Sequence, residues 1–206
     1  MNKKKLVSAL AAASVVASGG ILGASSVAAK KPSPPSCFPN CQGADLSDGD
    51  YRKAQMAGGN FSGATLSGTS MVKATVNGAN FENAQGIGAS FIKAKLQESI
   101  LTGANFNGSF FRKAQMQGAN LSGANLSGSV LKKANLSGAN LTGATLARTA
   151  LQHATLTNGN LANADFTNAN FSYANLTGAN LSGANFTGAT FKKTICPDGS
   201  KTNSGC

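Results

Sequence analysis

Apolar residues recur at every fifth position along most of the chain. From Leu46 to Phe191 there are thirty such central positions, and all but Gly86 carry Leu, Phe, Met, Val or Tyr. Ala is the commonest residue two places before a central position, and Gly or Asn is common two places after it. No insertion or deletion interrupts this frame.

A period of five fits neither an α-helix nor a flat β-strand. On an α-helix, residues five apart are rotated by about 500°, which scatters them over every face. On a strand, an odd period sends successive apolar residues to opposite faces. The chain must therefore turn once per repeat, and the repeats must stack to bury their apolar residues. The pattern predicts a solenoid, with Ala where the chain crowds inward and Gly or Asn at the turn.

Lysine adds a second, longer period. Two places after the central residue, Lys occurs at six positions that share one twenty-residue phase, namely Lys53, Lys73, Lys93, Lys113, Lys133 and Lys193. Four pentapeptides per coil follow from this spacing. With about 4.8 Å between coils, about seven and a half coils give a rod about 36 Å long.

Phrases such as Ala-Asn-Leu-Ser-Gly and Ala-Asp-Phe-Thr-Asn make residues 44–194 resemble the pentapeptide-repeat family. This resemblance implies an all-β fold, a right-handed quadrilateral β-helix with one pentapeptide per side and twenty residues per coil. Some members of the family resemble duplex DNA in shape and negative charge, and block DNA gyrase. Because this chain is basic, lacks projecting loops and carries an export signal, we do not expect it to mimic DNA.

The amino-terminal 29 residues have the layout of a secretory signal peptide. Lysines at positions 3–5 precede an uncharged, mostly apolar stretch over 6–17, and small or apolar residues at 27–29 form a cleavage site. A retained membrane anchor is the alternative, because residues 6–29 carry no charge. The richness of this stretch in Ala, Ser and Gly favours cleavage near Ala29 and export to a periplasm, cell surface, lumen or medium.

The remaining composition fits one exported domain with flanking segments. The 206 residues carry a net charge of +11, and the hydrophobic content of 41% argues against disorder despite only 12% charged residues. Residues 30–43 are interpreted as a Pro/Ser linker and an N-terminal cap, and residues 195–206 as a C-terminal tail.

Four cysteines lie at the ends of the repeats, and an even number in an exported chain predicts disulfides. Bridged Cα atoms lie about 4.4–6.8 Å apart, much less than the rod length. The local pairs Cys37–Cys41 and Cys196–Cys206 are therefore favoured over crossed pairs, and a four-cysteine zinc site is disfavoured. No calcium motif is present in the tail. Its polar loop residues are interpreted as turn formers: Asp198, Gly199, Ser200 and Asn203.

The side of the coil that carries the six lysines is the least uniform. Its candidate binding residues are Arg52, Lys53, Lys73, Lys93, Arg112, Lys113, Lys132, Lys133, Lys192 and Lys193. The lysine column is completed by His153 and Tyr173. Apolar residues occur at normally polar positions of this side: Val72, Ile92, Phe110 and Val130. The inward Ala is replaced by Gly49, Thr69, Ser109, Ser129 and Thr149.

Two interpretations of this side remain open from the sequence. Stacked lysines repel by about 0.9 kcal/mol per neighbouring pair in water, a small penalty. The column can therefore serve to keep a flat β surface soluble and unpaired. Alternatively, it is a binding face for an anionic envelope polymer, a nucleic acid or a membrane surface.

Two further irregularities are interpreted as structural. At Gly86 the central residue is Gly and an apolar residue, Ile87, follows one place late, which predicts a local bulge or a shifted side chain. A series of asparagines on another side predicts a hydrogen-bond ladder interrupted by Ile100. Its members are Asn60, Asn80, Asn120, Asn140, Asn160 and Asn180.

The sequence offers little for catalysis. His153 is the only histidine, and the acidic cluster Asp45, Asp48 and Asp50 is interpreted as part of the N-terminal cap. We expect no enzymatic activity, cofactor, metal or small-molecule substrate. The favoured function is an exported scaffold with a cationic face for anionic partners. The alternative is a purely structural or spacer protein in which the lysine column serves solubility.

Overall fold

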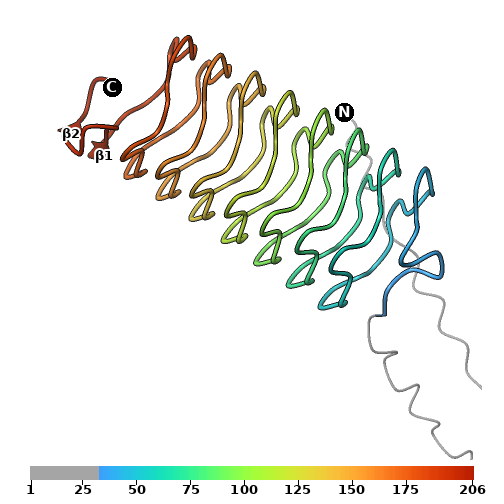
Figure 1. Cartoon of the computed structure of the whole chain (residues 1–206). Helices are drawn as coiled ribbons and strands as arrows, with labels where there is room; N and C mark the ends of the chain where they lie inside the picture. The colour runs from blue at the N-terminus through green and yellow to red at the C-terminus, as the bar shows by residue number, and fades with distance from the viewer. Residues whose placement is uncertain (1–32) are drawn as a thin grey trace, which may run out of the picture. The chain divides into compact units, whose positions relative to one another are not determined.

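The computed structural model describes residues 33–206. The predicted signal peptide and its cleavage site near Ala29 lie outside the described residues. The described chain forms a continuous stack of coils that advances steadily from its N-terminal to its C-terminal end (Figure 1).

Each pentapeptide adopts the same conformation. In one example, the Ala134 N–H donates to the Leu131 carbonyl at 2.9 Å, closing a β-turn through Lys132 and Lys133. Lys133 has a φ of 60°, and every fifth residue from 43 to 193 likewise has a positive φ. A positive φ at the third turn residue is the feature of a type II turn, which favours Gly or Asn. The predicted turn in every repeat is therefore present.

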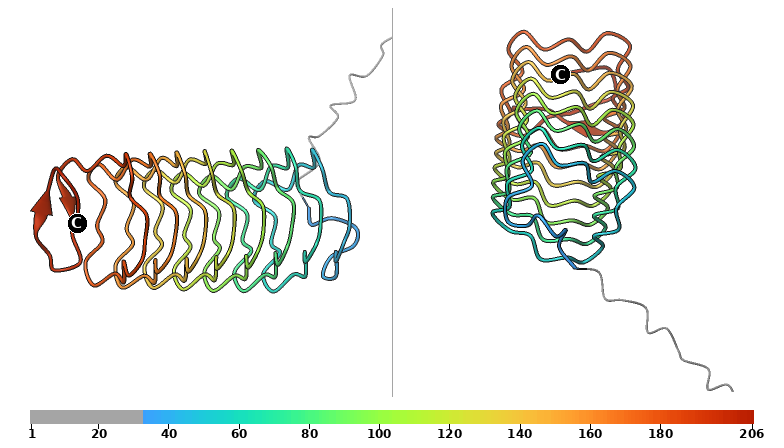
Figure 2. Two further views of the ribbon diagram at one scale, coloured as in Figure 1. Left: turned by 90° about the horizontal axis from the view of Figure 1, so that it is seen from above. Right: turned by 90° about the vertical axis from the view of Figure 1, so that its right-hand side faces the viewer.

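Successive coils are joined by parallel bridges between residues twenty apart, from Asn40↔Asn60 to Asn175↔Ile195. The Leu121 N–H donates to the Asn140 carbonyl at 2.7 Å, so the backbone is paired on the next coil. Figure 2 shows the coils stacked in register. The twenty-residue phase of the lysines is thus the spacing between neighbours on adjacent coils.

Within residues 33–206, regular strands occur only at the C-terminal end. Strands β1 (Thr194–Ile195) and β2 (Lys201–Thr202) pair antiparallel. Among residues 33–206, the structure has no helix that is long and apolar enough to span a membrane.

The interior is filled by the central residues and the inward alanines. Phe91 and Phe111 stack at 5.0 Å between ring centroids, and Phe106 meets both edge-on at 5.4 and 5.6 Å. Where Ser or Thr replaces the inward Ala, the buried hydroxyl donates to a carbonyl of the preceding coil, except that Ser99 donates to Leu96 of its own coil. Ser109 Oγ, for example, donates to the Gly86 carbonyl at 2.7 Å. These replacements are structural, because each hydrogen bond compensates the burial of a polar group.

The prediction of a local bulge at Gly86 is wrong. The Gly86 N–H donates to the Asn105 carbonyl and the Ala89 N–H to the Gly86 carbonyl, as in the neighbouring repeats. A Cβ at Gly86 would lie 2.2 Å from Cε1 of Phe106, so the Phe106 ring occupies the space of the missing side chain. Ile87 keeps its outward position and is 51% exposed. The frame is unbroken.

Local disulfides join Cys37 to Cys41 and Cys196 to Cys206, with Cα–Cα distances of 5.0 and 5.4 Å. The pairing is the one that the sequence favours.

The asparagine ladder is only partial. Side-chain amides of Asn60, Asn140 and Asn180 donate to the asparagine one coil earlier, whereas Asn160 donates instead to Thr142. Ile100, which is 40% exposed, stands between Asn80 and Asn120.

Candidate binding face on the basic side of the coil

One side of the coil brings the ten candidate binding residues together. We call it the basic side and define it as residues 50–53, 70–73, 90–93, 110–113, 130–133, 150–153, 170–173 and 190–193. The Lys93 N–H donates to the Arg112 carbonyl at 3.0 Å, and the Lys113 N–H to the Lys132 carbonyl at 3.0 Å. These bonds fix each segment beside the next. All ten basic side chains are exposed.

The basic side differs from the rest of the described surface in charge. It carries ten basic residues and one acid, Asp50. The rest of residues 33–206 carries three basic residues, Lys95, Arg148 and Lys201, and six acids. Those acids are Asp45, Asp48, Glu82, Glu98, Asp165 and Asp198. The positive charge of the described chain is therefore concentrated on one side.

Only Arg52 has a carboxylate partner among the described residues. Its Nε and Nη2 donate to the two Asp50 carboxylate oxygens at 2.8 and 2.6 Å. Hydrogen bonding to the Arg52 side chain, and then to its backbone N–H, lowers the pKa of Asp50. The same contact raises the pKa of Arg52. The other nine cations of the basic side have no ion-pair partner within residues 33–206.

The lysine column occupies an unfavourable backbone conformation. The six lysines have φ values between 51° and 61°, in the left-handed region. At the same position on the rest of the coil the residue is Gly or Asn except at Asp48, Glu98 and Arg148. On the basic side no Gly or Asn occurs there, from Lys53 to Lys193. Large side chains thus replace the residues that this turn prefers.

Aromatic rings continue the column beyond Lys133. His153 and Tyr173 stack with ring centroids 4.8 Å apart and planes inclined by 4°. Both are exposed. The stack keeps the two rings at the turn position that lysine occupies on the other coils, so the column is uninterrupted to Lys193.

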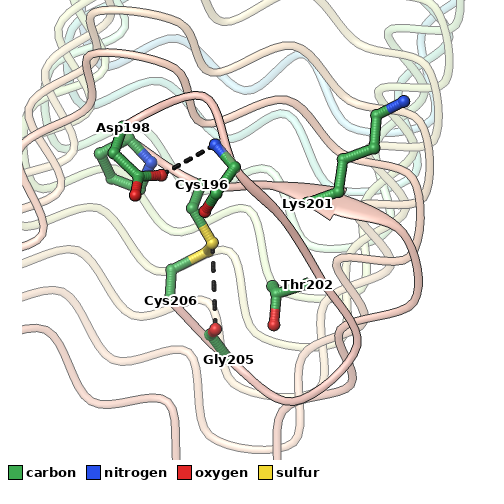
Figure 3. Close-up of a pocket in the computed structure, with 8 residues that line it drawn as sticks. Cys196, Asp198, Lys201, Thr202, Gly205 and Cys206 are labelled. Atoms are coloured by element: carbon green, nitrogen blue, oxygen red, sulfur yellow. Dashed lines mark hydrogen bonds between the residues drawn. A yellow bond between two sulfur atoms is a disulfide. The ribbon is translucent and has the colours of Figure 1, made fainter.

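Two depressions among the described residues lie away from the basic side. One is formed by the loop of the Cys196–Cys206 disulfide (Figure 3). Its Asp198 carboxylate accepts the Ser200 N–H at 2.9 Å, as a turn residue does. Asn203 likewise accepts the Lys193 N–H at 2.8 Å. No group of three potential metal ligands occurs within residues 33–206.

Three features of this side were not predicted from the sequence. The Asp50–Arg52 pair was detectable, because both residues lie at outward positions two apart. The His153–Tyr173 stack was detectable from their twenty-residue spacing. The positive φ of the lysines was not predictable from their residue type, because Lys rarely adopts a positive φ.

Comparison with known proteins identifies the family of the repeat. The family model for pentapeptide repeats matches in eight copies, over residues 40–78, 60–103, 101–132, 119–158 and 160–195. Among curated proteins, none shows significant sequence similarity to the chain.

Solved structures of pentapeptide-repeat proteins resemble the chain. QnrB1, a plasmid-mediated fluoroquinolone resistance protein, is 17% identical with a TM-score of 0.50, covering 72% of this chain and 83% of its own. HetL, involved in heterocyst differentiation regulation in the cyanobacterium Nostoc sp. strain PCC 7120, is 24% identical. Its match covers 79% of this chain and 91% of HetL, with a TM-score of 0.35. The family model matches more than half of the chain and agrees with the observed repeat, so the chain belongs to the pentapeptide-repeat family.

Proposed function

We propose that the protein is a non-enzymatic exported scaffold whose basic side binds anionic surfaces or anionic partners. The observation that carries the proposal is the charge asymmetry, with ten basic residues and one acid on a single side. Such a concentration of charge attracts polyanions and raises their rate of association.

The stability cost of the lysine column supports a role of these lysines in binding a partner. A non-glycine residue in the left-handed conformation loses about 1–2 kcal/mol. Neighbouring ammonium groups about 4.8 Å apart repel by about 0.9 kcal/mol in water, less with salt. Gly at the turn, as on the rest of the coil, would avoid both penalties. Since a solubilising charge can stand at other outward positions without this strain, we infer that the placement of the lysines serves a partner.

Export is proposed from the signal-peptide pattern that ends near Ala29. The two disulfides support it, because disulfides persist in oxidising compartments.

The proposed architecture is a right-handed quadrilateral β-helix of about seven and a half coils. Bridges between residues twenty apart support four pentapeptides per coil. We assign no catalytic step to this scaffold. Its interior is packed with Phe and Leu side chains, and His153 stacks on Tyr173 at the surface.

The proposal is tested by co-sedimentation of the mature protein, beginning at Lys30, with anionic and neutral vesicles and with anionic cell-envelope polymers at low and high salt. The test variant carries Lys93→Glu, Lys113→Glu and Lys133→Glu. Glu98 already occupies this turn at a φ of 57°, so the substitutions suit the backbone. We expect salt-sensitive binding that the variant loses.

A matched control carries Lys95→Glu, Arg148→Glu and Lys201→Glu, which changes the net charge by the same amount on other surfaces. The proposal requires this control to bind nearly as the parent does. Equal loss in both variants would mean that net charge alone drives binding. Unchanged binding in both variants would mean that the lysine column has no part in binding, and no binding in the parent would favour the purely structural alternative.

A further inference from the structure

The basic side contains outward apolar residues in two rows, of which Phe110 is exposed and the others are half-buried. Phe110 is 42% exposed and is bridged to Val130, which is bridged in turn to Ala150. Val72 and Ile92 lie one coil apart in the second outward row, where their carbonyls accept the Lys53 and Lys73 N–H groups. We call these five residues the apolar cluster.

The exposed apolar residues on other sides stand alone. Ile100 is bridged to Asn80 and Asn120, and Ile87 lies between polar residues of the neighbouring coils. Single apolar residues are ordinary at a protein surface, whereas a contiguous group marks an interaction site. The basic side is therefore where apolar contact and positive charge coincide.

Cations surround the apolar cluster. Segments 90–93, 110–113 and 130–133 lie side by side, because the Phe91 N–H donates to Phe110 and the Phe111 N–H to Val130. They place five exposed cations around Phe110 and Val130, namely Lys93, Arg112, Lys113, Lys132 and Lys133. Long basic side chains can extend to lipid phosphates while an apolar centre enters the acyl boundary.

We propose that the anionic surface recognised by the basic side is a phospholipid bilayer, into which Phe110 and Val130 insert. The inference rests on the proposed function of the basic side and specifies its partner. A soluble polyanion would need the charges alone and would leave the apolar cluster in water. A bilayer uses both, since interfacial binding combines buried apolar area with attraction of Lys and Arg to anionic headgroups.

The absence of Trp from the chain makes insertion directly measurable. Phe110→Trp supplies a single Trp emitter within the apolar cluster. Ile100→Trp supplies a matched control, because Ile100 is 40% exposed but lies among asparagines. Each variant is mixed with phosphatidylcholine vesicles, with or without phosphatidylglycerol. We expect a blue shift and quenching by brominated acyl chains only for Phe110→Trp and only with phosphatidylglycerol.

A second variant separates insertion from charge. Phe110→Ser with Val130→Ser keeps every cation, and Ser already occupies the same row at Ser70 and Ser90. We expect about tenfold weaker binding to phosphatidylglycerol vesicles and unchanged binding to dextran sulfate, a soluble polyanion. The triple variant Lys93→Glu, Lys113→Glu and Lys133→Glu, which reverses three charges, should bind neither the vesicles nor dextran sulfate.

The outcomes distinguish the inference from the proposed function. If the Ser variant binds vesicles as the parent does and Phe110→Trp shows no blue shift, insertion is wrong while the charged contact stands. If the parent binds dextran sulfate but no vesicles, the partner is a polyanion and the bilayer is overturned. If it binds none of the tested anionic surfaces, both proposals fall.

Discussion

The basic side and the side that precedes it along the chain share one backbone but differ at the turn. On the preceding side, Gly88, Gly108 and Gly128 stand at φ values of 65–68°. One pentapeptide later, Lys93 and Lys113 stand at 59–60°. Apart from Asp48 and Arg148, the turns of the preceding side are thus filled by Gly or Asn, which suit them best, whereas the basic side has large and mostly charged residues at the same turn. The difference indicates that stability guides the first choice and surface chemistry the second.

The two sides also differ behind the surface. Phe91 and Phe111 fill their central positions on the basic side, whereas Gly86 leaves its place on the preceding side to Phe106. The interior therefore compensates between adjacent coils of the same side, because Gly86 and Phe106 are twenty residues apart.

The largest expected effect comes from restoring the common residue at the irregular central position. Gly86→Leu would direct a side chain into the Phe106 ring, which lies 2.2 Å from an ideal Cβ. Overpacking of this kind costs about 1–3 kcal/mol or more, so we expect a loss near 3 kcal/mol in urea unfolding. If Gly86 were instead an ordinary defect in the repeat, the substitution would stabilise the protein.

A double variant serves as the control for this prediction. Gly86→Leu with Phe106→Leu gives both coils Leu, the commonest central residue. We expect it to recover most of the lost free energy of unfolding, because the ring that fills the gap is gone. Failure to recover would place the strain in the backbone at Gly86 rather than in packing against Phe106.

The sequence predicted the repeat and its phase better than the contacts between repeats. A frame without insertions brings residues twenty apart together whatever their identity, so the column from Lys53 to Lys133 was predictable. The Phe106 ring at Gly86 was not, because it depends on side-chain directions across coils. The sequence places Val72, Ile92, Phe110 and Val130 on one side of the coil, but the continuity from Phe110 to Ala150 needed the bridges of the structure.

The turns offer the next test. Lys93→Gly, Lys113→Gly and Lys133→Gly together should stabilise the protein by roughly 2 kcal/mol in urea unfolding. Each site gains about 1–2 kcal/mol by relief of the left-handed strain and loses about 0.5–1 kcal/mol to glycine entropy. The same variant should lose binding to anionic surfaces. A loss of stability would mean that the lysine side chains hold the coils together.

The reciprocal change places lysines on the preceding side, as Gly88→Lys, Gly108→Lys and Gly128→Lys. An ideal Cβ at each of these glycines meets no atom within 4 Å, so only the backbone conformation opposes the change. We expect a loss of roughly 2 kcal/mol in urea unfolding. A variant combining both sets moves the lysines by one side without changing net charge. If bilayer binding needs the apolar cluster, this combined variant will not recover it.

The smallest effect concerns the single acid of the basic side. Hydrogen bonds from the Arg52 side chain and then its N–H lower the pKa of Asp50 below its ordinary value of 3.8. Because the folded-state pKa is depressed, the pair stabilises the fold above that value, and the contribution is lost as the pH falls through the folded-state pKa. We expect an NMR titration midpoint below 3.8 for the Asp50 carboxyl carbon, and a rise toward 3.8 in Arg52→Gln.

Asp45 is the internal control for this titration. Its pKa is lowered by hydrogen bonding to the Ser47 side chain and backbone, so Arg52→Gln should leave it unchanged. If both carboxyl groups shift together, the cause is the summed charge of the basic side rather than the direct contact. A shift of Asp50 alone would show that Arg52 is partly neutralised within the protein. Asp50→Asn would then release Arg52 from its ion pair and slightly strengthen binding to anionic vesicles. The unpaired positive charge of the basic side would then extend to Arg52 at its N-terminal end.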